Sequence, residues 1–192
     1  HGGPGFDFKP DNPLHSFIFY SDDECHTWQM SRNTMTAPGR GAHEPSIVEL
    51  EDGRLLCFLR TTCKCICKSI STDNGETWSK PAPTKLEAPD SPPLLKHLPG
   101  SNHLLCIWNN IPSESNWPRT PLTVAVSTDE GETWQNFQNL DNRTDYDAAY
   151  ASILFRDKEA LVAYYSRKTE GARDASVLLK IYDIQQFENT HV

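Results

Sequence analysis

The sequence predicts an all-β fold made of small repeated sheets, and two features support this prediction. The first is a series of short apolar runs separated by turn residues, with 10 Gly and 14 Pro among 192 residues. No long run shows the 3.6-residue apolar period of a helix. The second is an eight-residue motif that begins at positions 21, 71 and 127, so that its copies are 50 and 56 residues apart. Repeats of this length are typical of solenoids and propellers.

The repeated octet has the pattern Ser-x-Asp-x-Gly-x-Thr-Trp. Residues 71–78 and 127–134 are identical at seven of eight positions, whereas residues 21–28 carry Cys25 in place of the glycine. The Asp carboxylate can accept backbone N–H groups, the Gly supplies positive φ, and the Trp can pin the loop to its own sheet. We therefore expect three equivalent hairpin turns on one face, the first of them strained at Cys25. The tryptophans expected to pack are Trp28, Trp78 and Trp134.

Ten apolar runs bounded by turn residues are expected to be strands. Asp52 and Gly53 form a dipeptide typical of a tight hairpin turn, which joins the second run to the third. Blades of four short strands at this repeat length are the pattern of a β-propeller, and 192 residues would supply three to four blades. The runs are residues 16–20, 46–51, 54–60, 66–71, 94–98, 103–108, 122–127, 151–156, 159–165 and 176–182.

The composition restricts the classes of partner. A formal net charge of -8 argues against nucleic acid, because no basic surface is available to neutralise phosphates. No apolar stretch approaches the roughly 20 residues that a membrane-spanning helix needs. One domain over residues 1–192 is expected. The start at His1, without an initiator Met or a signal peptide, predicts an amino end cut from within a longer protein.

Six cysteines are present, and three of them alternate at Cys63, Cys65 and Cys67. On a strand the three thiols would share one face, but neighbours would lie ~6.6 Å apart along the strand, which is unfavourable for a disulfide. A metal site is conceivable, yet no His-x-His or second Cys pair completes one. We favour three small, half-buried side chains and expect most of the six thiols to be reduced.

The octet resembles the Asp box of sialidases (neuraminidases) and of other bacterial neuraminidase repeat proteins, and the likeness covers most of residues 15–185. The resemblance implies a six-bladed β-propeller, of which this chain would be roughly the C-terminal half. It also implies that each box joins the third and fourth strands of a blade, on the face away from the active site. The implied function is that of an exo-sialidase, a hydrolase that releases terminal sialic acid from glycoconjugates. The resemblance alone slightly favours a secreted or periplasmic location.

Four polar residues lie on the rim opposite the boxes when strand directions are counted from the boxes. Arg119 comes just before the strand that leads into the third box, and Tyr150 just before the first strand of the next blade. Pairing outward from the tight hairpin turn sets Pro45 opposite Arg60, so that Glu44 and Arg60 are neighbours. The binding site of a propeller of this family lies on that rim.

The resemblance assigns these four residues roles. Residues 44–60 look like the sialidase hairpin that carries a glutamate and one arginine of a triad, and Arg119 looks like the next triad arginine. Arginines grip the carboxylate of sialic acid with paired hydrogen bonds. Because that carboxylate would repel a carboxylate nucleophile, the family uses a tyrosine, here Tyr150. A phenol with a pKa of ~10 needs a base, here Glu44, and the sugar would be released with retention. No metal or organic cofactor is implied.

Each of these residues also has a purely structural interpretation. Glu44 and Arg60 could form a cross-strand ion pair, Arg119 a solvated loop charge, and Tyr150, like nearby Tyr146, a cover over apolar surface. The alternatives for the protein are a propeller acting on another sugar, as exo-acting arabinanases do, or a carbohydrate-binding propeller without catalysis. Both arginines together favour an anionic sugar, and the Glu and Tyr pair favours an enzyme.

Two parts of the expected site have no match in the sequence, namely the catalytic Asp and the first triad arginine. Asp145 and Asp147 are close to Tyr150, but nothing marks either as the acid. The chain by itself is therefore expected to hold half of a site and to lack activity. Hydrolase activity is expected of the full-length parent.

Overall fold

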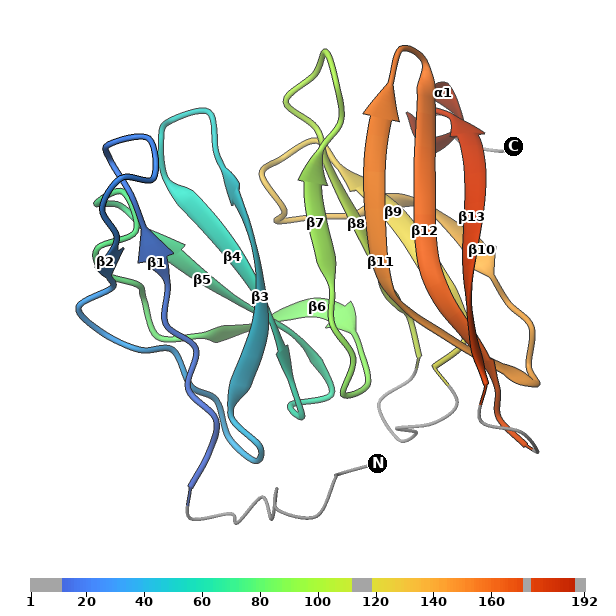
Figure 1. Ribbon diagram of the computed structural model, residues 1–192, viewed down its shortest axis with the longest axis horizontal. Coiled ribbons are helices and arrows are strands. Elements are labelled where there is room, and N and C mark those ends of the chain that lie inside the picture. The colour runs from blue at the N-terminus through green and yellow to red at the C-terminus, as the bar shows by residue number, and fades with distance from the viewer. Residues whose placement is uncertain (1–11, 112–118, 171–173, 189–192) are drawn as a thin grey trace.

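Four antiparallel sheets follow one another along the chain in the computed structural model, which describes residues 12–111, 119–170 and 174–188 (Figure 1). Each sheet consists of strands that are consecutive in sequence. The predicted all-β, propeller-type fold is confirmed, with two four-stranded sheets, one three-stranded sheet and one strand pair in the described part of the chain. The strand pair consists of β1 (Phe19–Tyr20) and β2 (Gln29–Met30), and the first four-stranded sheet of β3 (Ala42–Glu49), β4 (Leu55–Thr61), β5 (Cys65–Ser71) and β6 (Ala82–Glu87). The second four-stranded sheet consists of β7 (Leu94–His97), β8 (Leu104–Asn109), β9 (Leu122–Ser127) and β10 (Gln135–Asp141). The three-stranded sheet consists of β11 (Tyr146–Arg156), β12 (Glu159–Lys168) and β13 (Ala175–Asp183), and helix α1 (Gln185–Glu188) follows it.

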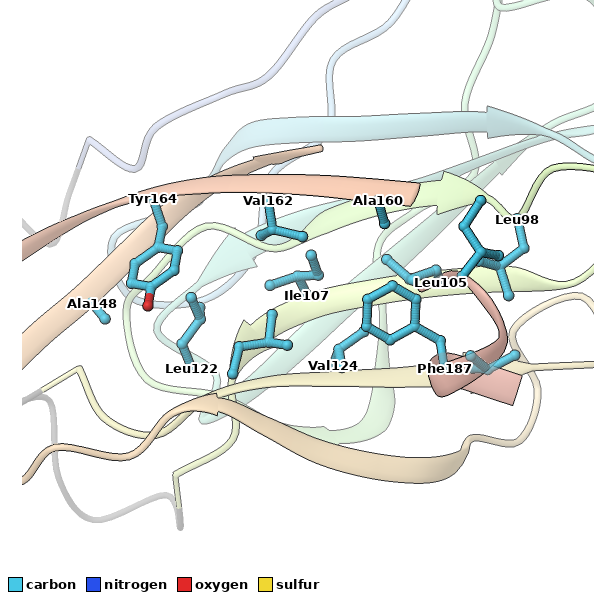
Figure 2. Close-up of a cluster of buried hydrophobic side chains, with 13 residues drawn as sticks. Leu98, Leu105, Ile107, Leu122, Val124, Ala148, Ala160, Val162, Tyr164 and Phe187 are labelled. Atoms are coloured by element: carbon cyan, nitrogen blue, oxygen red, sulfur yellow. The ribbon is translucent and has the colours of Figure 1, made fainter. Parts of the chain in front are cut away.

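The core lies between neighbouring sheets, because the middle strands are covered on both faces. Every residue of β8 and β9 is buried, which explains why these strands appear as unbroken apolar runs instead of alternating patterns. One cluster joins the β7–β10 sheet to the β11–β13 sheet, with Ile107 facing Val162 (Figure 2). A second cluster joins the β3–β6 and β7–β10 sheets. Sheet-on-sheet packing of this kind fixes the blades relative to one another.

The three octets form the same turn, as predicted. In each, the Asp carboxylate accepts the backbone N–H of the Thr at 2.8 Å and also the Thr hydroxyl, and the Ser hydroxyl donates to the same carboxylate at 2.8 Å. Cys25 takes φ 69° where Gly75 and Gly131 take 91° and 84°. The first octet therefore keeps the turn although it lacks glycine, because its side-chain hydrogen bonds hold it.

The predicted tryptophan packing is confirmed only in part. Trp78 is buried and packs with Cys57, Leu59 and the upstream Met35. Trp134 is partly buried, and its ring centroid lies 5.9 Å from that of Phe58 in the preceding sheet. The prediction is wrong for Trp28, which is 57% exposed. The two covered rings therefore contact the preceding sheet or segment as well as their own sheet.

Strand pairing places the boxes and the two predicted site arginines at opposite ends of the sheets. In the β4–β5 pair, Leu55 faces Ser71 at the box end, and Arg60 lies beyond the last pair at the other end. In the β8–β9 pair, Ser127 at the box end faces Leu104, whereas Arg119 comes just before β9. The direction argument made from the sequence is confirmed for both arginines. The predicted start of the next strand is wrong, because Tyr150 lies inside β11 at an interruption of the pairing and not just before the strand.

The predicted register of the β3–β4 hairpin is wrong by a small shift. His43, not Pro45, is opposite Arg60, because the turn spans five residues and a bulge interrupts β3 between His43 and Ser46. The outermost strands that follow each octet, β2, β6 and β10, were not predicted, since their mostly exposed residues form no apolar run.

The six cysteines are all unpaired; Cys57, Cys67 and Cys106 are buried, and Cys25 is exposed. Cys63 and Cys65 are half-buried, as expected for small packing side chains. Within the described ranges, no group of three His, Cys, Asp or Glu side chains is placed to hold a metal ion. The described part of the chain also contains no helix long and apolar enough to cross a membrane.

Candidate active site

Glu44, Arg60 and Tyr150 form a closed set of hydrogen bonds at the rim opposite the boxes. The Tyr150 hydroxyl donates to Glu44 Oε1 at 2.9 Å. Arg60 Nη1 donates to Glu44 Oε2 at 2.8 Å and to the Tyr150 oxygen at 3.1 Å. The three side chains come from β3, β4 and β11, and residues 44 and 150 are 106 positions apart. The fold thus brings a phenol, a carboxylate and a guanidinium into direct contact.

Glu44 and Tyr150 are both held in a left-handed backbone conformation, with φ of 51° and 55°. Each lies in a strand interruption, between His43 and Ser46 on β3 and between Ala149 and Ser152 on β11. A bulge turns its extra residue out of the regular alternation and re-aims the side chain. Left-handed non-glycine residues are uncommon and strained, and such strain gathers at functional sites. Two matched interruptions therefore direct the carboxylate and the phenol toward each other.

The exposure of Arg60 and Tyr150 differs in a way that suits a binding site. Arg60 is 7% exposed, whereas Tyr150 is 48% exposed. Burial lowers the pKa of Arg60, but hydrogen bonds to Asp90 and Glu44 outweigh it, so the pKa is held above its ordinary range. The arginine is thus a fixed cation beneath an accessible phenol.

Arg119 is the fourth predicted residue, and it lies beside Tyr150. Its Cζ atom is 5.7 Å from the centroid of the Tyr150 ring. Its Nη1 donates to the Tyr165 hydroxyl at 3.3 Å and its Nη2 to the Asp90 carbonyl at 2.9 Å. Like Arg60, it is 7% exposed. The interpretation of Arg119 as a solvated loop charge is therefore wrong.

The backbone around Arg119 is fixed by buried side chains. Asp147 Oδ1 accepts the Arg119 backbone N–H at 2.9 Å, and its Oδ2 accepts Arg167 Nη2 at 2.6 Å. Asn109 donates to the carbonyls of Arg119 and Ala148 at 3.0 and 2.8 Å. Asp147 is 1% exposed, so its carboxylate is committed to this scaffold.

Sequence reasoning missed Asp90, which touches both site arginines. Its Oδ1 accepts Arg60 Nε at 2.6 Å, its Oδ2 accepts Arg40 Nη1, and His43 Nε2 lies 3.6 Å from Oδ1. Burial would raise the pKa of Asp90, but the nearby His43 ring, the hydrogen bond from Arg60 and the charges of Arg60 and Arg40 hold it well below its usual range. The sequence signal that could have identified Asp90 was its position. It lies in a proline-rich link before β7, at the same rim as the site.

Comparison with known proteins places these observations in a family. The model of the BNR repeat-like domain matches residues 7–159. An anhydrosialidase of Macrobdella decora is 42% identical over 67 residues, which are 34% of this chain and 8% of that protein. A sialidase of Micromonospora viridifaciens is 28% identical over 125 residues, which are 60% of this chain and 18% of that protein. The chain thus spans less than a fifth of either relative.

A solved structure supports the fold over almost the whole chain. The NanB sialidase of Streptococcus pneumoniae superimposes with a TM-score of 0.71 at 21% identity, covering 90% of this chain and 28% of that one. At this identity the likeness concerns the fold alone. The repeated octets, the propeller-type sheets and the match over residues 7–159 agree. The chain belongs to the BNR repeat-like domain family of the sialidase superfamily.

Proposed function

We propose that this chain supplies the nucleophile and carboxylate-binding part of a retaining exo-sialidase site. The observation that carries the proposal is the contact of the Tyr150 hydroxyl with Glu44 at 2.9 Å and with Arg60 at 3.1 Å. A nucleophile, a base and a cation within hydrogen-bond distance are the geometry that an activated tyrosine needs. The names of the related proteins supply the class of substrate, a sialylated glycan.

The proposed mechanism begins with proton transfer from the Tyr150 hydroxyl to Glu44 Oε1. The phenolate oxygen then attacks the anomeric carbon of the sugar as the glycosidic bond breaks. A group outside the assigned residues protonates the leaving oxygen. Arg60 Nη1 lies against the phenolic oxygen and can stabilise its developing charge. Water then attacks the anomeric carbon from the face that the leaving group vacated and gives a proton to the group that had protonated that leaving group. The bond to Tyr150 breaks, Glu44 returns its proton to the Tyr150 oxygen, and the configuration is retained.

The two arginines explain why an anionic sugar is favoured. Arg60 and Arg119 flank Tyr150, one at its hydroxyl and the other near its ring. A carboxylate on the anomeric carbon would then sit next to two cations at the moment of attack. A neutral sugar such as arabinose has no carboxylate to interact with these two cations.

The test uses Tyr150→Phe in the intact protein, with Tyr146→Phe as the control. Both variants lose one hydroxyl from β11, but Tyr146 packs against Arg143, 4.1 Å from its ring centroid. Hydrolysis of a fluorogenic sialoside should fall at least ~10³-fold for Tyr150→Phe and little for Tyr146→Phe. NMR should show the released sugar first in the anomeric configuration of the substrate.

Three outcomes would count against this proposal. Unchanged turnover in Tyr150→Phe would remove Tyr150 as nucleophile. Loss of activity in Tyr146→Phe alone would move the role to that residue. Sialic acid binding by the full-length wild-type protein without any turnover would identify a carbohydrate-binding propeller instead.

A further inference from the structure

The link between β6 and β7 carries an aspartate whose carboxylate contacts two arginines and whose backbone carbonyl contacts a third. Asp90 lies between Pro89 and the Pro92-Pro93 pair, where the chain crosses from one sheet to the next. Its side chain is 13% exposed. Such a short, proline-rich segment has little backbone freedom, so the carboxylate is held in a defined place.

Asp90 uses each of its acceptors for a different cationic partner. One carboxylate oxygen accepts Arg60 Nε at 2.6 Å, and the other accepts Arg40 Nη1. The Asp90 backbone carbonyl accepts Arg119 Nη2 at 2.9 Å. One residue therefore contacts both arginines of the proposed site.

The bond at Arg60 Nε has a geometric consequence for the rest of that side chain. A guanidinium is planar and its five donors have fixed directions. With Nε directed at Asp90, Nη1 faces Glu44 and Tyr150 at 2.8 and 3.1 Å. Arg60 Nη2 donates to no other residue in the described part of the chain, so this group is available to a ligand carboxylate.

We propose that Asp90 is a positioning residue, which orients Arg60 so that one end of its guanidinium serves Tyr150 and Glu44 while Nη2 faces the ligand. The functional part of this inference rests on the proposed sialidase-type site. The orientation of Arg60 can be tested without any ligand. Charge neutralisation alone would not require the bond to Nε, because Arg40 and Arg60 could share the carboxylate in other ways.

The first experiment follows the Arg60 Nε–H signal by ¹H–¹⁵N NMR, with Arg60→Lys to assign it. In the wild-type protein this hydrogen should exchange slowly, because it is buried and bonded to a carboxylate. Asp90→Asn should speed its exchange at least ~10-fold and shift the Tyr150 ring signals. The matched control is Asp52→Asn, which removes the carboxylate that accepts Arg54 Nε at 2.6 Å on an exposed turn. That control should leave the signals of Arg60 and Tyr150 unchanged.

The second experiment is a double-mutant cycle on ligand binding and turnover in the intact protein. A displaced guanidinium should lower kcat by up to ~10²-fold and weaken binding of N-acetylneuraminate in Asp90→Asn. If Asp90 acts through Arg60, the same substitution in an Arg60→Met background should have less than about a two-fold effect. An equal effect in both backgrounds would overturn the positioning role.

Two further results separate the possible failures. Wild-type protein that binds no sialic acid would refute the proposed function, and the NMR measurement would then decide the role of Asp90 alone. Unchanged Arg60 Nε–H exchange in Asp90→Asn would overturn the inference, whatever the activity. If Asp90→Asn fails to fold, Asp90→Glu replaces it, since it keeps the charge and moves the carboxylate by one methylene. The same exchange and cycle criteria apply to that variant.

Discussion

The left-handed backbone at Glu44 predicts an inversion of the usual stability order of alanine and glycine. In an ordinary strand position, glycine is less stable than alanine by about 0.5–1 kcal/mol because it loses more backbone entropy. At φ 51° the left-handed backbone destabilises alanine by about 1–2 kcal/mol but does not destabilise glycine. Glu44→Gly should therefore be more stable than Glu44→Ala by about 0.5–1 kcal/mol. Both variants lose the contacts to Arg60 and Tyr150 equally, so those contacts cancel.

The matched control is Glu49 on the same strand, which is exposed and has an ordinary strand backbone. There, Glu49→Ala should be more stable than Glu49→Gly by about 0.5–1 kcal/mol. Urea unfolding of the four variants measures both differences, with midpoint shifts of about 0.25–0.5 M for an m-value of about 2 kcal/mol/M. The sum of the glycine–alanine differences at positions 44 and 49 gives the free-energy penalty of the left-handed backbone for alanine. If Glu44→Ala is as stable as Glu44→Gly or more stable, the backbone at position 44 is not strained and the reasoning is wrong.

Three further predictions concern the turns, the close backbone contacts and the thiols. The pKa of Asp23 is lowered to about 2 because the Thr27 N–H and hydroxyl donate to the ionised carboxylate. The contribution of this carboxylate to stability should therefore be complete above about pH 4 and vanish as the pH falls through 2. An NMR titration midpoint near 4 would contradict this. Gly41→Ala should lower the free energy of unfolding by about 2–5 kcal/mol, because the new Cβ would lie 2.1 Å from the backbone oxygen of Leu14. Gly53→Ala, whose new Cβ would meet no other atom, should lower it by only about 1–2 kcal/mol. Similar urea midpoints for the two variants would contradict this. All six thiols should titrate in the unfolded, unreduced protein, and Cys25 should react first in the native state; fewer free thiols would show disulfides.

Much of the fold could be predicted because its local signals agree. The middle strands are apolar since they are covered on both faces, and each octet contains all the side chains of its own turn. The last strand of each full blade could not be predicted. β6 and β10 present polar, mostly exposed residues, and their pairing depends on the neighbouring strand instead of their own composition.

The limits of site prediction follow from sequence separation. Glu44 and Arg60 could be paired from the hairpin between them, because a tight turn fixes which residues face each other within about one position. Tyr150 could be placed on the same rim by strand direction, and the family resemblance paired it with Glu44. The two bulges that produce this contact, however, have no signature in the local sequence. Asp90 was missed because its role depends on Arg60 and Arg40, which are distant in sequence and contact it only in the folded protein.

The sequence by itself determined the all-β architecture, the repeated turns and the rim on which the polar residues gather, since these depend on periodicity and on residues close together in the chain. The tertiary structure decided the rest. It buried Arg60 and Arg119, brought Tyr150 within 2.9 Å of Glu44, and left Trp28 exposed where Trp78 is covered. These outcomes depend on the packing of one sheet against the next and on bulges of one residue, and such contacts between distant segments have no signature in the local sequence.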